Sequence, residues 1–323
     1  MRLLTTPPVV AAVVVATTAA STVTIQPIIA RDFPDPALLA VGNTYYAYST
    51  ASNYNGKVWH VPVQRSTKLN GRWTVVNDAM PDLPSWVGKD GAGNGNVWAP
   101  EVAARSDGTY ILYFTARATP QNVQCIGVAL ADSPTGPFQQ VGDKPLVCRP
   151  EDIDSIDPKA FTDSNGKQYL LYTSGRGKAT IWLQQVSIDG MTPIGSRRAL
   201  IQSDRPEEGN IVEAPTLVRQ GDNYVLFYSG NAFNSGKYFV NYATSSSLAS
   251  AFEKAPGQFL SKETLGGAIT NPGGQDVVPG SKNDYLIFHG YTAPGQRAMF
   301  VAPLTWDENG KPVLHVKSVV KTP

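Results

Sequence analysis

The length, composition and charge of the chain limit the classes of protein to which it can belong. Its 323 residues are enough to bury a large core in one domain or two. The 27 basic residues are balanced by 26 acidic ones, which argues against binding to nucleic acid or a membrane surface through bulk charge. The 29 glycines, 25 prolines and 14 tyrosines are typical of strands and turns, not of a helical protein.

The N-terminal segment, residues 1–20, predicts a secretory signal peptide. One arginine is followed by an apolar run over residues 9–15 and then by small residues suited to cleavage near Ala20. The run is too short to span a bilayer. Two cysteines, Cys125 and Cys148, fit an oxidising compartment as one disulfide, with two separate buried thiols as the alternative. We therefore expect a secreted, extracellular protein.

The rest of the chain repeats one unit five times. Each unit has an acid near a proline, an apolar strand, a turn rich in Gly, Asn or Asp, and a second strand with tyrosines or small residues at its end. The units cover residues 35–50, 99–116, 157–175, 213–230 and 275–291, and their leading acids are Asp35, Glu101, Asp157, Glu213 and Asp276. Two further apolar segments follow each hairpin. Five four-stranded units predict an all-β fold, a five-bladed β-propeller that forms a single catalytic domain over residues 21–323.

The leading acids of a propeller are expected to meet at one end of its axis. Asp35, Asp157 and Glu213 stand where innermost strands begin, so they should converge although they are far apart in the sequence. A single Asp-Pro usually caps a turn, but three converging carboxylates repel one another and raise at least one pKa, which favours a functional site. Hydrolysis of a glycosidic bond uses one protonated and one ionised acid, and a third can keep the first protonated.

Aromatic residues accompany these acids. Phe33 precedes Asp35 by two residues, and Trp98 lies at the beginning of the second unit. Their rings could supply the flat apolar faces on which sugars stack, with packing in the core as the alternative for each.

Four motifs carry a resemblance to a known family. RDFPDPALL (31–39), NVWAPEV (96–102), SIDPKAF (155–161) and VEAPTLV (212–218), in this order and spacing, resemble glycoside hydrolase family 43. That family comprises five-bladed propellers that include α-L-arabinofuranosidases, β-xylosidases and endo-arabinanases. The resemblance covers essentially the whole chain after the leader. It implies an inverting mechanism in which Asp35 is the general base, Glu213 the general acid, and Asp157 the residue that modulates the pKa of Glu213 and orients it.

The resemblance also bears on the fifth unit. Arg297, in GQRAMFV, matches an arginine that many relatives direct into the site, with a surface position as the alternative. Arabinanase-like members carry a Gly-Pro-Gly-His type segment whose histidine lies near an axial ion, whereas NPGGQDVV places Gly274 or Gln275 there. Gln275 therefore joins Phe33, Trp98 and Arg297 as a candidate for substrate binding. No cofactor is expected to be required, no metal ligands are assigned, and an axial calcium ion stays an open alternative.

Together these features predict a secreted, monomeric, inverting hydrolase of plant cell-wall polysaccharide or oligosaccharide. We expect an exo-acting α-L-arabinofuranosidase that releases arabinose from arabinan or arabinoxylan, because residues 84–102 and 297–312 resemble most the exo-arabinofuranosidase branch of the family. The segment from 82 to 96 could also close one end of a cleft. A β-xylosidase and an endo-1,5-α-L-arabinanase remain alternatives. A non-catalytic sugar-binding propeller is a further alternative, but it would have no need of all three acids.

Overall fold

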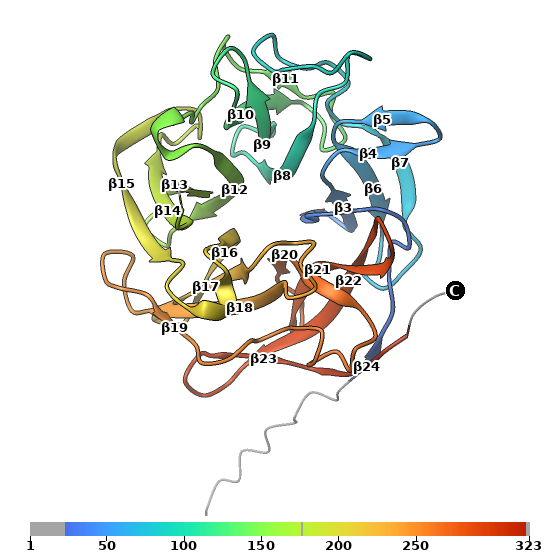
Figure 1. Ribbon diagram of the computed structural model, residues 1–323, viewed down its shortest axis with the longest axis vertical. Helices are drawn as coiled ribbons and strands as arrows, with labels where there is room; N and C mark the ends of the chain where they lie inside the picture. Colours follow the sequence, from blue (N-terminus) through green and yellow to red (C-terminus); the bar gives the residue numbers. More distant parts are fainter. Residues whose placement is uncertain (1–22, 176, 321–323) are drawn as a thin grey trace, which may run out of the picture.

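The computed structural model describes residues 23–175 and 177–320, whose regular secondary structure is almost entirely β-strand (Figure 1). Within this part, five four-stranded antiparallel sheets, the blades, stand in a ring around a central axis. The predicted five-bladed β-propeller is thereby confirmed. The predicted signal peptide, residues 1–20, lies outside the described residues. No helix in the described ranges is long and apolar enough to cross a membrane.

The blades follow one another in chain order, and each begins with the strand nearest the axis. Blade 1 comprises β2 (Ala37–Val41), β3 (Thr44–Tyr48), β6 (Pro62–Ser66) and β7 (Thr74–Asp78). Blade 2 comprises β8 (Val97–Ala104), β9 (Tyr110–Ala118), β10 (Val123–Ala131) and β11 (Gln139–Gln140). Blade 3 comprises β12 (Ser155–Thr162), β13 (Gln168–Ser174), β14 (Thr180–Val186) and β15 (Pro193–Gln202). Blade 4 comprises β16 (Val212–Gln220), β17 (Asn223–Gly230), β18 (Phe239–Ser245) and β19 (Glu253–Lys254). Blade 5 comprises β20 (Thr270–Val278), β21 (Asp284–Ala293), β22 (Gln296–Trp306) and β23 (Pro312–Leu314).

Short elements connect and join the blades. They are the hairpin β4 (Ser52–Tyr54) and β5 (Lys57–Trp59), the 3₁₀ turns η1 (Pro150–Asp152) and η2 (Pro206–Glu208), and the paired strands β1 (Val23–Ile25) and β24 (Val316–Val319). The predicted disulfide between Cys125 and Cys148 is present and holds the segment after β11 against β10. It therefore ties the outer part of blade 2 to its middle.

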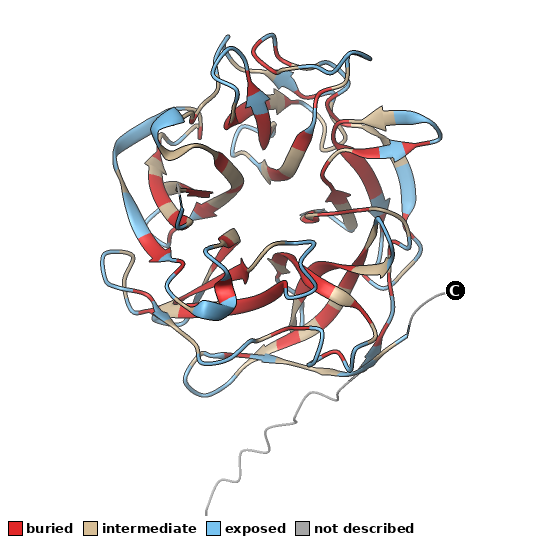
Figure 2. Ribbon diagram, in the orientation of Figure 1, coloured by how far each residue is buried: buried red, intermediate tan, exposed pale blue. Residues whose placement is uncertain are grey.

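Apolar side chains fill the spaces between neighbouring blades. Strand β9 shows how this arises, because alternate residues of a strand point to opposite faces. Leu112 and Phe114 pack against blade 1, whereas Ile111 and Tyr113 pack against blade 3. Both faces of a blade are thus buried, which explains why these strands read as continuous apolar runs. Figure 2 shows the buried segments within the ring and the exposed ones concentrated on the outer strands and loops.

Each innermost strand carries, at or just before its start, a residue with left-handed backbone followed by proline. The five pairs, with φ between +40° and +56°, are Asp35-Pro36, Ala99-Pro100, Asp157-Pro158, Ala214-Pro215 and Asn271-Pro272. In β8, β12, β16 and β20 the pairing register is interrupted at this place, as expected for a bulge around a residue without an N–H donor. The prolines, and not the acids, therefore mark equivalent positions in the five blades. Asp35 and Asp157 are the residues directly before a proline, whereas Glu213 lies one residue earlier, before Ala214.

The ring is closed between blade 5 and blade 1 without a shared strand. β1 pairs in parallel with β24, and Ile25 of β1 is buried in the apolar cluster between blades 4 and 5. The backbone N–H of Phe33 donates to the carbonyl of Arg297 at 2.8 Å. Asp32 accepts the backbone N–H of Arg297 at 3.0 Å. The segment before β2 thus fastens blade 1 to blade 5.

Candidate active site

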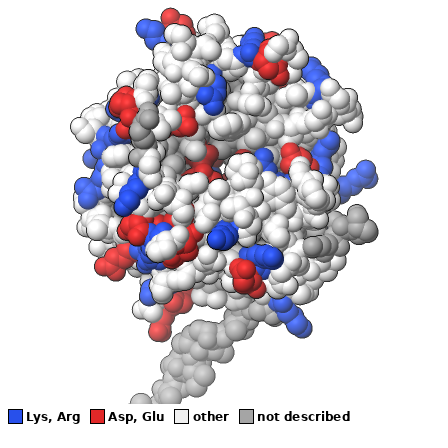
Figure 3. Space-filling view, in the orientation of Figure 1, with Lys and Arg blue, Asp and Glu red and all other residues white. Residues whose placement is uncertain are grey.

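One end of the propeller axis opens into a cavity of about 250 Å³. All five blades contribute to its wall. The lining residues are Asp35, Thr50, Trp98, Ile156, Asp157, Glu213, Phe233, Tyr238 and Arg297. Figure 3 shows acidic side chains at the hollowed centre of one face of the molecule. The structure therefore brings together the three predicted acids with Trp98 and Arg297.

Asp35 is held in its ionised form by groups from blades 1 and 5. Its Oδ2 accepts a hydrogen bond from Oγ1 of Thr50 at 2.6 Å and lies 3.7 Å from Nη1 of Arg297. Burial alone would raise the pKa of Asp35, but the Arg297 guanidinium and the Thr50 hydroxyl help to hold the pKa well below its ordinary range. Asp35 is therefore a carboxylate at neutral pH.

The other two acids are shifted in the opposite direction. Burial, with the charge of Asp35 second, raises the pKa of Asp157 to about 7. Burial, with the charge of Asp157 second, raises the pKa of Glu213 to about 8. Oδ2 of Asp157 accepts the N–H of Ala214 at 2.9 Å, and the hydroxyl of Tyr238 donates to Oε1 of Glu213 at 2.8 Å. The cavity thus combines one ionised carboxylate with two carboxyl groups that retain protons near neutrality.

Two consecutive glycines of blade 5 admit the side chains behind these acids. A Cβ atom on Gly273 would overlap the ring of Tyr238, and one on Gly274 would lie 2.6 Å from Nδ1 of His289 and 2.7 Å from Oδ1 of Asp35. The rings of Tyr238 and His289 stack with their centroids 5.9 Å apart. Burial lowers the pKa of His289, so its neutral ring can accept the backbone N–H of Asp35 at 3.1 Å. The two glycines of the segment NPGGQDVV therefore leave the space that Tyr238, His289 and Asp35 occupy.

Two of the predicted substrate-binding residues do not face this cavity. The prediction for Phe33 is wrong, because its side chain has no exposed surface and packs in the cluster between blades 5 and 1. Gln275 is buried, and both the oxygen and the nitrogen of its side-chain amide form hydrogen bonds with blade 4. Its oxygen accepts from Oγ of Ser229 at 2.7 Å, and its nitrogen donates to the carbonyl of Ala214 at 2.5 Å. Gln275 thus joins blades 4 and 5 and does not line the cavity that holds the three acids.

Two aromatic residues of the cavity were not predicted from the sequence. Phe233 is 42% exposed, and the guanidinium of Arg297 lies 5.0 Å from its ring centroid. Tyr238 contacts Glu213 directly. Both come from the loop between β17 and β18, whose sequence NAFNSGKY carries two aromatics directly after a predicted hairpin. That combination is the signal that could have identified them.

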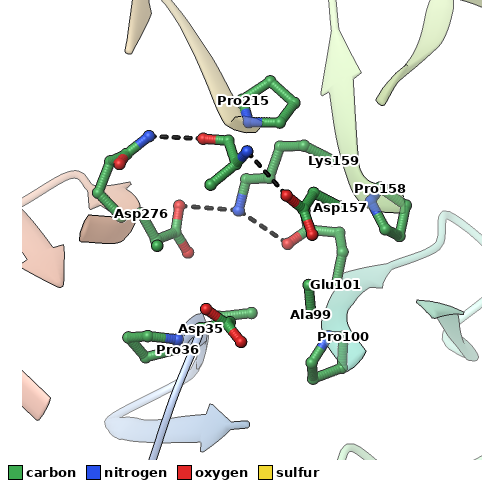
Figure 4. A pocket seen from close by; sticks show the side chains of 14 residues that line it. Asp35, Pro36, Ala99, Pro100, Glu101, Asp157, Pro158, Lys159, Pro215 and Asp276 are labelled. Atoms are coloured by element: carbon green, nitrogen blue, oxygen red, sulfur yellow. Dashed lines mark hydrogen bonds and ion pairs between the residues drawn. The ribbon is translucent and has the colours of Figure 1, made fainter. Parts of the chain in front are cut away.

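Farther along the inner strands, a second group of charges surrounds the axis (Figure 4). Nζ of Lys159 lies 2.7 Å from Oε2 of Glu101 and 2.7 Å from Oδ1 of Asp276. Across residues 23–175 and 177–320, no three His, Cys, Asp or Glu side chains are grouped so as to hold a metal ion. The axial carboxylates that a calcium ion would need already bind an ammonium group. These residues therefore do not fit an axial calcium site.

An ionised carboxylate facing a protonated one, in a cavity flanked by aromatic rings, defines the site of a glycoside hydrolase. The chain belongs to the family described as glycosyl hydrolases family 43, whose model matches residues 24–312. Members of this family invert the configuration at the anomeric carbon. The predicted family and enzyme class are thereby confirmed.

Characterised relatives differ in how they act on their polymer. The chain is 28% identical over 290 residues to an extracellular endo-α-(1→5)-L-arabinanase of Bacillus subtilis, covering 84% of each chain. It is 24% identical over 322 residues to an extracellular exo-α-(1→5)-L-arabinofuranosidase of Cellvibrio japonicus, covering 89% of this chain and 88% of the relative. Among solved structures, a thermostable family-43 glycoside hydrolase matches with a TM-score of 0.76 at 23% identity, covering 94% of this chain and 98% of that one.

Proposed function

We propose that this chain is a secreted, exo-acting α-L-arabinofuranosidase that releases arabinose from arabinan or arabinoxylan. The observation that carries the proposed hydrolysis is the meeting of Asp35 and Glu213 in one cavity, where burial and neighbouring charges shift their pKa values in opposite directions. Curated relatives of this chain are named as extracellular enzymes that act on arabinan, which supports both the substrate and secretion.

Asp35 is the general base of the proposed reaction. Its carboxylate takes a proton from water as the water oxygen forms a bond to the anomeric carbon. Arg297 and Thr50 keep this carboxylate ionised and fix its orientation. The water attacks from the face opposite the leaving group, so the first product has inverted configuration.

Glu213 is the general acid. It gives its proton to the glycosidic oxygen as the bond from the anomeric carbon to that oxygen breaks. Burial and the neighbouring Asp157 keep the proton on Glu213 near neutral pH, and the Tyr238 hydroxyl stabilises the carboxylate that remains after transfer. Asp157 is itself fixed by the N–H of Ala214, the residue that follows Glu213. Asp157 thus modulates and orients the acid.

The size of the cavity supports exo action. Its volume of about 250 Å³ lies below the roughly 300–1,000 Å³ that is typical of ligand pockets. Such a cavity suits one terminal sugar better than several consecutive sugars of a polymer. Trp98 and Phe233 offer apolar faces to that sugar, and Arg297 offers hydrogen-bond donors.

Glu213→Gln tests the assignment of the acid. Its activity on p-nitrophenyl α-L-arabinofuranoside and on arabinan should fall by about 10²–10⁴-fold. Activity on the 2,4-dinitrophenyl glycoside should be retained, because that leaving group departs without protonation. Asp35→Asn should lose activity on all of these substrates. Glu308→Gln, at an exposed position, is the matched control. Near-normal hydrolysis of arabinan by Glu213→Gln would contradict the assignment.

Product analysis tests the remaining parts of the proposal. Arabinose should be the first product from debranched arabinan, and NMR should show it as the inverted anomer. Early release of oligosaccharides would indicate endo action, and faster cleavage of p-nitrophenyl β-D-xyloside would indicate a xylosidase. Absence of hydrolysis on every substrate, with binding retained, would favour a sugar-binding propeller.

A further inference from the structure

We propose that the ammonium group of Lys159 is the permanent cation of the propeller axis and that Lys159 is a positioning residue for Asp35 and Asp157. This inference rests on the proposed function. It assigns to a side chain of blade 3 the place that a bound metal ion would otherwise take.

The first support is the geometry around Nζ of Lys159. Glu101 comes from blade 2, Lys159 from blade 3 and Asp276 from blade 5, and both contacts measure 2.7 Å (Figure 4). Glu101 is 6% exposed and Asp276 is 3% exposed. One nitrogen atom therefore joins three blades at the axis through charged hydrogen bonds that little solvent reaches.

The second support is the connection to the catalytic acids. Lys159 follows Asp157 by two residues, directly after the bulge at Pro158. Oδ2 of Asp276 accepts the N–H of Leu38 at 3.0 Å, and Leu38 follows Asp35 by three residues. The ion pairs thus anchor β12, which contains Asp157, and β2, which begins two residues after Asp35. Precise placement of two acids on different blades requires such support behind them.

The third support is charge balance. Burial lowers the pKa of Lys159, but Asp276 and Glu101 raise it more, so the ammonium stays charged. Burial raises the pKa of Glu101 to about 7, and the charge of Lys159 opposes this rise, so without the cation Glu101 would bind a proton at neutral pH. Two buried carboxylates without a cation would be costly, because each would lose its hydration without gaining a partner. The space that remains on the axis is about 40 Å³, which holds only a few water molecules. A calcium ion takes roughly 6–8 oxygen ligands, and the two carboxylates at this place already bind Lys159.

Lys159→Ala tests the proposal, because it leaves Glu101 and Asp276 around an open position. The kcat on p-nitrophenyl α-L-arabinofuranoside should fall by about 10²-fold with little change in KM, since the acids are misplaced while the sugar contacts remain. Millimolar CaCl₂ or n-propylammonium, which matches the atoms removed, should restore at least a tenth of the lost kcat. Lys167→Ala, exposed in a turn of the same blade, is the control and should match the wild type.

Thermal unfolding supplies a readout that does not depend on activity. CaCl₂ should raise the Tm of Lys159→Ala and leave the Tm of the wild type unchanged, and EDTA should not affect the wild type. This result is expected even if the substrate assignment fails, so the two failures can be distinguished. If the wild type loses activity or Tm in EDTA and regains it with calcium, the proposal is overturned.

A charge-neutral variant covers the case in which Lys159→Ala does not fold. Lys159→Met combined with Glu101→Gln and Asp276→Asn removes the three charges together and leaves no buried ion unpaired. It should fold, show a reduced kcat, and fail to respond to calcium. A wild-type kcat in either variant would overturn the proposal. So would a loss in Lys159→Ala that neither cation restores, because that loss would then be merely structural.

Discussion

Glu213→Gln should make the folded protein more stable at alkaline pH. The fold raises the pKa of Glu213 from 4.5 to about 8, so between these values the native state binds more protons than the unfolded state. Stability therefore falls as pH rises through this window, by at most about 1.4 kcal/mol per pH unit. Over roughly 3.5 units this amounts to at most about 5 kcal/mol, and less where water screens the carboxylate. Glutamine has the same shape and no charge to bury.

Urea unfolding followed by tryptophan fluorescence measures this effect. Wild type and Glu213→Gln should have similar free energies of unfolding near pH 4.5, and the variant should be more stable by about 2–4 kcal/mol at pH 8. Glu308→Gln should follow the wild type at both pH values, because its side chain is exposed. If the variant gains the same stability at both pH values, or gains none at pH 8, the acid does not carry a raised pKa and the reasoning is refuted.

Two further substitutions probe the support behind the acids. Tyr238→Phe removes a hydrogen bond that lowers the pKa of Glu213, so the alkaline limb of the pH profile of kcat/KM should move up by about 0.5–1 unit, and a downward shift would contradict this. Gly274→Ala places a Cβ atom 2.7 Å from Oδ1 of Asp35 at a residue with φ of +56°, so kcat should fall about 10²-fold while circular dichroism is preserved. Gly295→Ala, where φ is +72° and nothing lies within 4 Å of the added atom, is its control, and equal kcat values for the two would refute the steric argument.

The architecture could be predicted because it is repeated. Five hairpins with explicit turn residues limit the fold to a radial arrangement, and the structure has it. The acids were a less regular marker of the repeat than the prolines. Successive prolines at positions 36, 100, 158, 215 and 272 are separated by 64, 58, 57 and 57 residues. The residue before each proline has left-handed backbone, which Asp and Asn adopt more readily than other residues but which is not expected for Ala or for a residue that precedes proline.

Part of the site could be predicted because its residues lie in or just before the inner strands. Asp35, Asp157, Glu213 and Trp98 do so, and the axis brings them together. Arg297 lies on β22, outside the inner strands, and could be predicted only from the resemblance to the family. Phe33 is close to Asp35 in sequence, but proximity does not determine on which side of the backbone a ring lies, and this one enters the core. The contact of Tyr238 with the acid depends on a loop conformation and on the missing side chain of a distant glycine, so no local pattern could predict it.

The charge state of the base depends on the closure of the ring. Asp35 belongs to blade 1, whereas Arg297 and His289, which contact it, belong to blade 5. This boundary is where neighbouring blades are not consecutive in the chain, and short contacts such as the β1–β24 pairing hold it. Hydrolysis thus depends on how the first and the last blade are held together. A circular permutant with its break between two other blades would make the boundary between blades 5 and 1 continuous in the polypeptide and would move the break away from the base.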